Sequence, residues 1–135
     1  MAYWIPEIQK LIIDQITKTP QLRTILQTRV YSKELAVVKS PKFPCLSFEI
    51  DPVTLLTNIC DARLKLWIWN NSSNSRDLIY DAYIEFVKKF DNQRFTVDKK
   101  HFIFQRRMEP VELYDQVLDA DYISAIWSIR GVINE

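Results

Sequence analysis

Hydrophobic residues near the start of the chain recur at helical spacing. Between residues 6 and 17 they fall at three- and four-residue steps, and Pro6 suits a first helical turn. Thr19 and Pro20 interrupt this pattern, and a shorter helix is predicted from there to about residue 27. The spacing therefore predicts an N-terminal helical hairpin.

Later segments alternate between apolar and polar residues, which is the period of a strand with one buried face. The predicted strands are residues 45–50, 61–70, 95–97, 101–109 and 122–133. Pro52 is expected to end the first of them, because proline cannot donate a ladder hydrogen bond. The last two are expected to form an antiparallel pair.

Three further segments either show neither helical nor strand spacing or mark a change from one to the other. Residues 30–44 hold Pro41 and Pro44 and are predicted as a long excursion, with a short extended piece at 35–38. A polar loop over residues 70–75 precedes a helix predicted from 76 to 90. Residues 110–121 are too long for a tight turn, so they form either a projecting loop or a splayed extension of both flanking strands.

This order of elements predicts an α+β fold within a single domain spanning residues 1–135. We expect one mainly antiparallel sheet of four to five strands. The N-terminal helical hairpin and a longer central helix are expected to pack chiefly on one face of that sheet.

Composition excludes several broad classes of protein. Apolar residues make up 47% and charged residues 26% of the chain, as in soluble globular domains and unlike disordered, collagen-like or membrane proteins. The net charge is +1, so no global field attracts nucleic acid or lipid. There is no apolar run of membrane-spanning length and no basic leader, so we expect an intracellular site of synthesis and no membrane partner.

The rarest residues limit the chemistry. Gly131 is the only glycine and His101 the only histidine, which excludes glycine-rich phosphate loops and histidine-based metal motifs. Cys45 and Cys60 form no CxxC motif and are interpreted as reduced thiols in the packing. His101 has no carboxylate neighbour in sequence and is interpreted as a surface residue at the start of a strand. We therefore expect no enzyme activity, no cofactor and no metal.

Five carboxylates gather in one stretch that has no Lys or Arg. They are Glu109, Glu112, Asp115, Asp119 and Asp121. Such a cluster is able to bind Mg²⁺ for phosphoryl chemistry, but no paired base or nucleophile accompanies it. A solvated loop, or a rim that meets a basic partner, is the favoured interpretation.

Basic and aromatic residues also lie close together in sequence. Lys65, Trp67 and Trp69 share one face of a predicted strand, and similar pairs occur at Arg94-Phe95 and across residues 99–102. These residue types stack on single-stranded nucleic acid, but they also dominate protein interfaces. Near-zero net charge and an aromatic content of 13% favour protein contact and self-association.

The layout resembles a known family over nearly the whole chain. Two short helices are followed by Arg29-Val30-Tyr31, by residues 43–48 (FPCLSF), by residues 64–69 (LKLWIW) leading into a polar loop and helix, and by a closing strand from Ala120 to Val132. In order, length and spacing this is similar to the tail terminator proteins of long-tailed bacteriophages, also called tail completion or tail-to-head joining proteins. The family pattern does not place segment 32–44.

The resemblance implies a structural virion protein that assembles in the host cytoplasm and resides in the tail or neck. It implies a homo-oligomeric, hexameric ring that caps the tail tube protein and meets the head connector or stopper protein, with genomic DNA passing through. Segments 52–60 and 110–121 are expected to project toward tube or connector. The expected interface residues are Trp67, Trp69, Glu112, Tyr114, Asp115, Asp119 and Asp121.

An acidic loop suits the mouth or lumen of such a ring, because carboxylates repel DNA phosphates. Two alternatives to a terminator remain. One is another neck component or a small adaptor that binds a partner as a monomer. The other is a metal-dependent phosphoesterase that uses the acidic cluster.

Overall fold

A computed structural model describes residues 4–32, 42–71 and 77–133 of the chain. Strands predominate in it, and the helices are short. In chain order the elements are α1 (Trp4–Lys18), α2 (Pro20–Leu26), β1 (Val30–Tyr31), β2 (Cys45–Leu55), β3 (Ile59–Asn71), α3 (Asp77–Phe90), β4 (Arg94–Val97), β5 (Lys100–Arg106), β6 (Val111–Asp115) and β7 (Ala120–Ile133).

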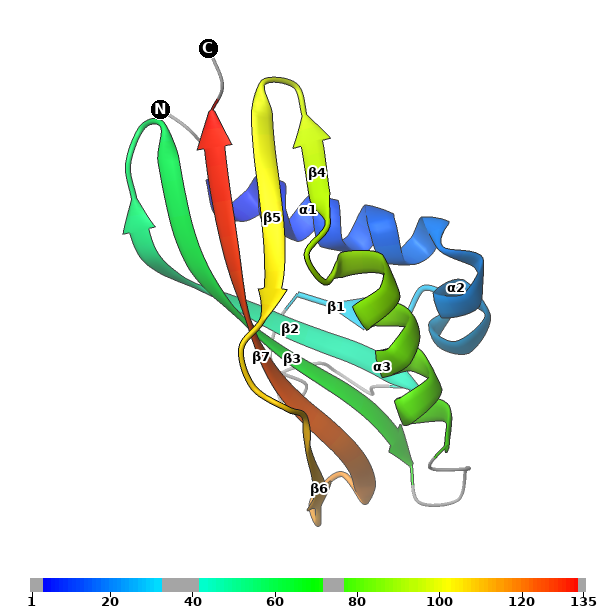
Figure 1. The fold of residues 1–135 in the computed structure, drawn as a ribbon. Helices are drawn as coiled ribbons and strands as arrows, with labels where there is room; N and C mark the ends of the chain where they lie inside the picture. Colours follow the sequence, from blue (N-terminus) through cyan, green and yellow to red (C-terminus); the bar gives the residue numbers. More distant parts are fainter. Residues whose placement is uncertain (1–3, 33–41, 72–76, 134–135) are drawn as a thin grey trace.

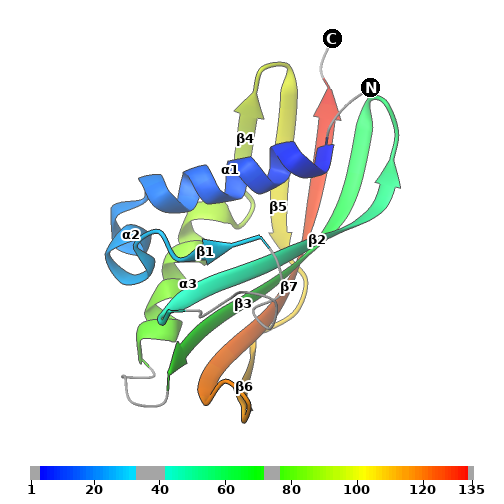
Figure 2. The same cartoon turned by 180° about the vertical axis from the view of Figure 1, so that it is seen from behind.

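The seven strands form one curled, mixed sheet (Figures 1 and 2). Its order is β1-β2-β3-β7-β5-β4, and β6 pairs with the first part of β7. Strand β1 is parallel to β2, whereas the other pairs are antiparallel. The pair of β3 and β7 forms the centre of the sheet, in register from Ile59 opposite Val132 to Asn71 opposite Ala120.

Alternation along the strands gives the sheet two different faces. The face that packs against the helices, here called the core face, carries Leu64, Leu66 and Ile68 of β3 opposite Trp127, Ala125 and Ile123 of β7. The helices complete this core with residues at helical spacing, such as Ile8, Ile12 and Ile16 of α1. One apolar cluster therefore joins all three helices to the sheet.

The opposite side of the sheet, the outer face, holds a smaller apolar cluster. Cys45, Trp69 and Ala120 are buried there, and Trp67 and Tyr122 pack against them. The rings of Trp69 and Tyr122 lie 4.2 Å apart between centroids. Both faces of β3 are thus partly apolar, as its sequence indicates.

The expected sheet of four to five antiparallel strands is wrong. The sheet has seven strands and is mixed, so the fold is mostly β rather than α+β. Strand β1 is two residues long, too short to show any alternation in sequence. Strand β6 lies inside segment 110–121, where pairing with β7 extends the sheet as a splayed hairpin.

The expected long central helix is also wrong. Helix α3 has 14 residues and α1 has 15, so the helix nearest the middle of the sequence is not the longest. Pro52 does not end β2, which continues to Leu55 through a register shift between Pro52 and Thr54. An irregularity of this kind accommodates a residue that lacks a backbone N–H.

Several sequence predictions are confirmed. The helical hairpin, the helix after the polar loop, and the strands at 61–70 and 122–133 occur with small shifts in their ends, and the strand at 45–50 is the first part of the longer β2. The predicted pair of 101–109 with 122–133 appears as β5 with β7. The extended piece at 35–38 and most of the loop at 70–75 lie outside the described residues.

Candidate functional site

The outer face of β3, β5 and β7 is hollowed where the sheet curls. The hollow has a volume of about 880 Å³. Its basic lining residues are Arg63, Arg107 and Arg130. Its apolar lining residues include Val53, Ile103, Met108 and Ile126. This basic hollow combines apolar walls with guanidinium groups, the mixture that accepts an acidic and apolar partner.

Strand register brings these arginines together. Arg63 lies opposite Ser128 in the β3–β7 ladder, and Arg107 Nε donates a hydrogen bond of 2.9 Å to Ser128 Oγ. Arg130 forms an exposed ion pair with Asp61, with 3.4 Å between Nε and Oδ1. Within the described ranges Arg63 has no ion pair. The lining therefore holds three cationic side chains and one carboxylate.

Sequence reasoning missed this hollow because its arginines come from different strands. Arg63 and Arg130 lie far apart in sequence, and they become neighbours only because β3 pairs with β7. The sequence signal that pointed to the hollow was the set of polar and basic residues on the outward side of each alternating strand. It becomes informative only once strand order and register are known.

Four of the five predicted carboxylates lie at the opposite end of β7, on the β6–β7 hairpin (residues 111–124), whereas Glu109 precedes the hairpin and lies beside Arg106 and Arg107. Asp115 Oδ1 accepts a hydrogen bond of 3.0 Å from the backbone N–H of Leu118, which fixes the turn. The hydroxyl of Tyr114 donates to Asp119, and this bond raises the pKa of Tyr114. Glu112 accepts a hydrogen bond from Tyr80 of α3. The carboxylates are thus spread along both strands and the turn.

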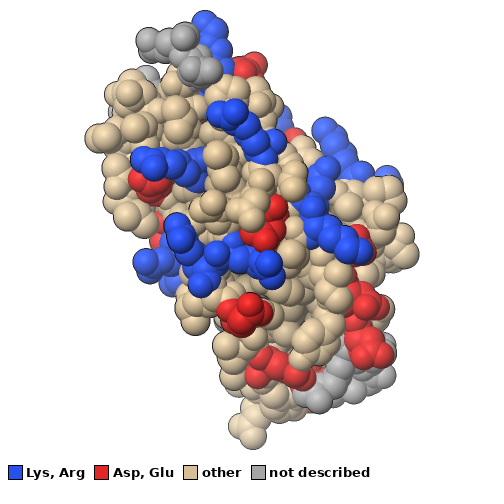
Figure 3. Space-filling model, viewed as in Figure 1, with Lys and Arg blue, Asp and Glu red and all other residues tan. Residues whose placement is uncertain are grey.

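The space-filling view shows an acidic lower end (Figure 3). Lys and Arg lie across the middle and upper parts of the molecule, with some Asp and Glu among them, whereas Asp and Glu predominate below, toward the end that holds β6. Although the net charge is only +1, charge is therefore unevenly distributed on this side of the molecule.

The two predicted interface tryptophans differ in exposure. Trp69 is 7% exposed, and its Nε1 donates a hydrogen bond of 3.0 Å to Ser47 Oγ on β2. Trp67 is half-buried beside it. Both therefore support the base of the acidic hairpin, whereas Glu112, Tyr114 and Asp119 are exposed on it.

Exposed apolar side chains concentrate at two ends of the sheet. At the β2–β3 turn they are Val53, Leu55 and Leu56. At and before the β6–β7 hairpin they are Met108, Val111, Leu113, Tyr114 and Val117. These ends lie far apart in Figure 1, so the chain presents two separate exposed apolar surfaces rather than one.

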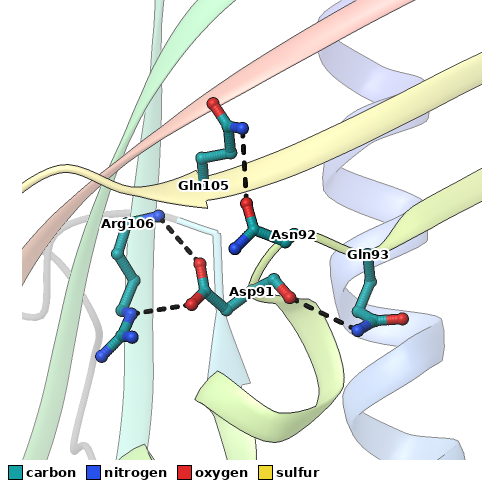
Figure 4. Close-up of polar contacts among 5 residues, drawn as sticks. All are labelled: Asp91, Asn92, Gln93, Gln105 and Arg106. Carbon is teal, nitrogen blue, oxygen red and sulfur yellow. Dashed lines mark hydrogen bonds and ion pairs between the residues drawn. The ribbon is translucent and has the colours of Figure 1, made fainter.

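A polar cluster fastens the end of α3 to β5 (Figure 4). Asp91 accepts two hydrogen bonds from Arg106, one of 3.2 Å from the backbone N–H and one of 2.9 Å from Nε. Gln105 Nε2 donates to Asn92 Oδ1 at 3.3 Å. The carboxylate is satisfied within the chain, so the cluster acts as a structural clamp between helix and sheet.

Neither cysteine carries a reactive thiolate. Burial raises the pKa of Cys45 to about 12, against an opposing effect of Arg29. Burial, with a contribution from the Asp61 charge, raises the pKa of Cys60 to about 11. His101 lies near the start of β5, with its Nδ1 2.9 Å from Thr96 Oγ1. These placements agree with the packing and surface interpretations of all three residues.

We expect both thiols to resist alkylation in the folded protein. From an ordinary value of 9.0, these pKa values lower the thiolate fraction near neutral pH roughly 100-fold for Cys60 and roughly 1,000-fold for Cys45. Mass spectrometry after iodoacetamide treatment should find little native labelling and complete labelling in urea. Rapid native labelling of either residue would contradict the placement.

The described residues form neither a metal-binding cluster nor a membrane-spanning helix. Across residues 4–32, 42–71 and 77–133, no three His, Cys, Asp or Glu side chains converge as a metal site would require. No helix in this part of the chain is long and apolar enough to cross a membrane.

Comparison with known proteins yields a structural match. No protein-family model matches this sequence, and no curated protein sequence matches it. The structure is similar to a chain of the solved structure "Virion of native gene transfer agent (GTA) particle", with a TM-score of 0.73. The alignment covers 97% of this chain and 99% of that chain at 11% sequence identity. This chain therefore shares the complete fold of that virion component.

Proposed function

We propose that this protein is a structural subunit of a phage-like virion, and that it acts as a tail terminator. In this role copies close into a ring on the end of the tail tube and present a surface to the head connector. The observation that carries the proposal is the shared fold, which extends over nearly all of both chains in the gene transfer agent particle. The order of helices and strands in this chain is similar to that of tail terminators, which favours this role over other structural roles within a virion.

Surface features support assembly with other copies. The apolar surface at the β6–β7 hairpin differs from the apolar surface at the other end of the sheet, where Val53 also lines the basic hollow, so contact between the two ends joins copies head to tail. Such a heterologous contact closes into a ring when the rotation between copies divides a full turn. A monomeric adaptor would have no need of two such surfaces.

The proposal predicts a ring in solution or on tube ends. Six copies of the 16.1-kDa chain would weigh about 97 kDa, which size-exclusion chromatography with light scattering resolves from a monomer. Addition of the protein to polymerising tail tube protein of the same particle should stop elongation and leave a ring at one tube end in electron micrographs. Continued elongation with a monomeric, unattached protein would refute the terminator role.

A further inference from the structure

The basic hollow and the acidic hairpin have complementary chemistry. The hollow offers Arg63 and Arg107 above an apolar floor that includes Ile103 and Ile126. The hairpin lies in the stretch between Arg107 and Arg130, which contains no Lys or Arg. Its turn places Val117 outward with 94% of its surface exposed. An apolar tip surrounded by carboxylates matches an apolar floor bordered by guanidinium groups.

One chain is unable to satisfy this complementarity by itself. Strand β7 pairs with β6 over residues 120–124 and passes beneath the hollow over residues 126–130. At about 3.3 Å per residue, Ala120 and Ser128 lie ~26 Å apart along a continuous strand. The hairpin continues away from the hollow, as Figure 1 shows for β6. Contact between the two surfaces therefore requires two copies.

We propose that the acidic hairpin of one copy docks in the basic hollow of the next copy. This rests on the proposed ring and identifies its contact. Val117 then covers the apolar floor, while Asp115 and Asp119 approach Arg63 and Arg107. Paired guanidinium and carboxylate groups provide both attraction and orientation at such a contact. Because donor and acceptor surfaces differ, each copy engages one neighbour with its hairpin and another with its hollow.

Introducing charges of opposite sign at Val117 tests the proposal without disturbing the fold, because this side chain is almost fully exposed. Val117→Arg brings a positive charge toward Arg63 and Arg107, and Val117→Glu brings a negative one. In sedimentation velocity over a concentration series, Val117→Arg should weaken self-association at least tenfold relative to Val117→Glu.

The decisive measurement repeats this pair in a reversed hollow. The double variant Arg63→Glu with Arg107→Glu should lose self-association when the hairpin is unchanged. In that background the order of the two Val117 variants should invert, so that Val117→Arg associates more tightly than Val117→Glu. A double-reversal control on the exposed helical side, Lys10→Glu with Arg23→Glu, should assemble like the wild type.

The outcomes separate this contact from the ring itself. If the wild type assembles but the order of the Val117 variants does not invert, the docking proposal is overturned and the ring stands. If the wild type stays monomeric at every concentration and forms no ring on tube ends, both are overturned. If Arg63→Glu with Arg107→Glu abolishes binding of a fluorescent DNA duplex and leaves assembly unchanged, the hollow is a nucleic-acid surface and the proposal fails.

Discussion

Replacing Trp127 by alanine is expected to lower the free energy of unfolding by about 3–5 kcal/mol. Trp127 is 0% exposed on the core face of β7 and meets the Phe86 ring edge-on, with 5.1 Å between centroids. Truncation leaves a cavity between β7 and α3 that the paired strands are unable to close. Urea denaturation should report the loss, together with a fall in the melting temperature of roughly 10–20 °C.

Trp67 provides the matched control, because it is the same residue type on the neighbouring strand. It is half-buried on the outer face, so Trp67→Ala should cost less than half as much. Equal losses for the two variants would contradict the assignment of Trp127 to the main core.

The second large effect is expected at Gly131. Gly131→Ala should destabilise the protein by about 1–3 kcal/mol, although alanine normally stabilises a strand relative to glycine. A Cβ at this position would lie 2.8 Å from Trp4 Cζ3 and 3.0 Å from Phe102 Cε1. The backbone is held by pairing with Cys60 on one side and Phe102 on the other, so it is unable to retreat.

Trp4 is also fixed in place. Its Nε1 donates a hydrogen bond of 2.8 Å to the carbonyl of Leu56, and its ring meets Phe102 edge-on. A double-mutant cycle isolates this clash: in a Trp4→Ala background, Gly131→Ala should cost at least about 0.5 kcal/mol less. Additive losses measured by urea denaturation would show that Trp4 is not the obstacle.

The sequence specified individual elements better than their assembly. Alternation at 61–70 and 122–133 located β3 and β7 because each has a fully buried side, as in Leu64 and Ile129. Strand β1 was missed because two residues are too few to show an alternating pattern. Its parallel partner, β2, also lies further along the chain, after residues 32–44. Strand β6 was obscured because every side chain from Val111 to Tyr114 is exposed, so no buried face marks it.

The same distinction applies to the candidate surfaces. The carboxylates from Glu109 to Asp121 lie close together in sequence, so their cluster was visible before folding. The basic hollow was not, since Arg63 lies opposite Ser128 on β3 and Arg107, which follows β5, donates a hydrogen bond to Ser128. Trp69 was expected at an interface, and its place beneath Tyr122 depends on register that alternation alone does not supply.

Strand β7 also has a mechanical consequence for the proposed assembly. The hairpin and the hollow both lie on β7, whose hydrogen-bonded pairing prevents it from stretching. The number of β7 residues between them therefore sets the distance between neighbouring copies in the proposed ring. Insertion of two residues into both β7 and its partner β3 would keep every side chain on its side of the pleat and lengthen that distance by about 7 Å. In the proposed ring, the circumference and the width of the central channel would then depend on this residue count.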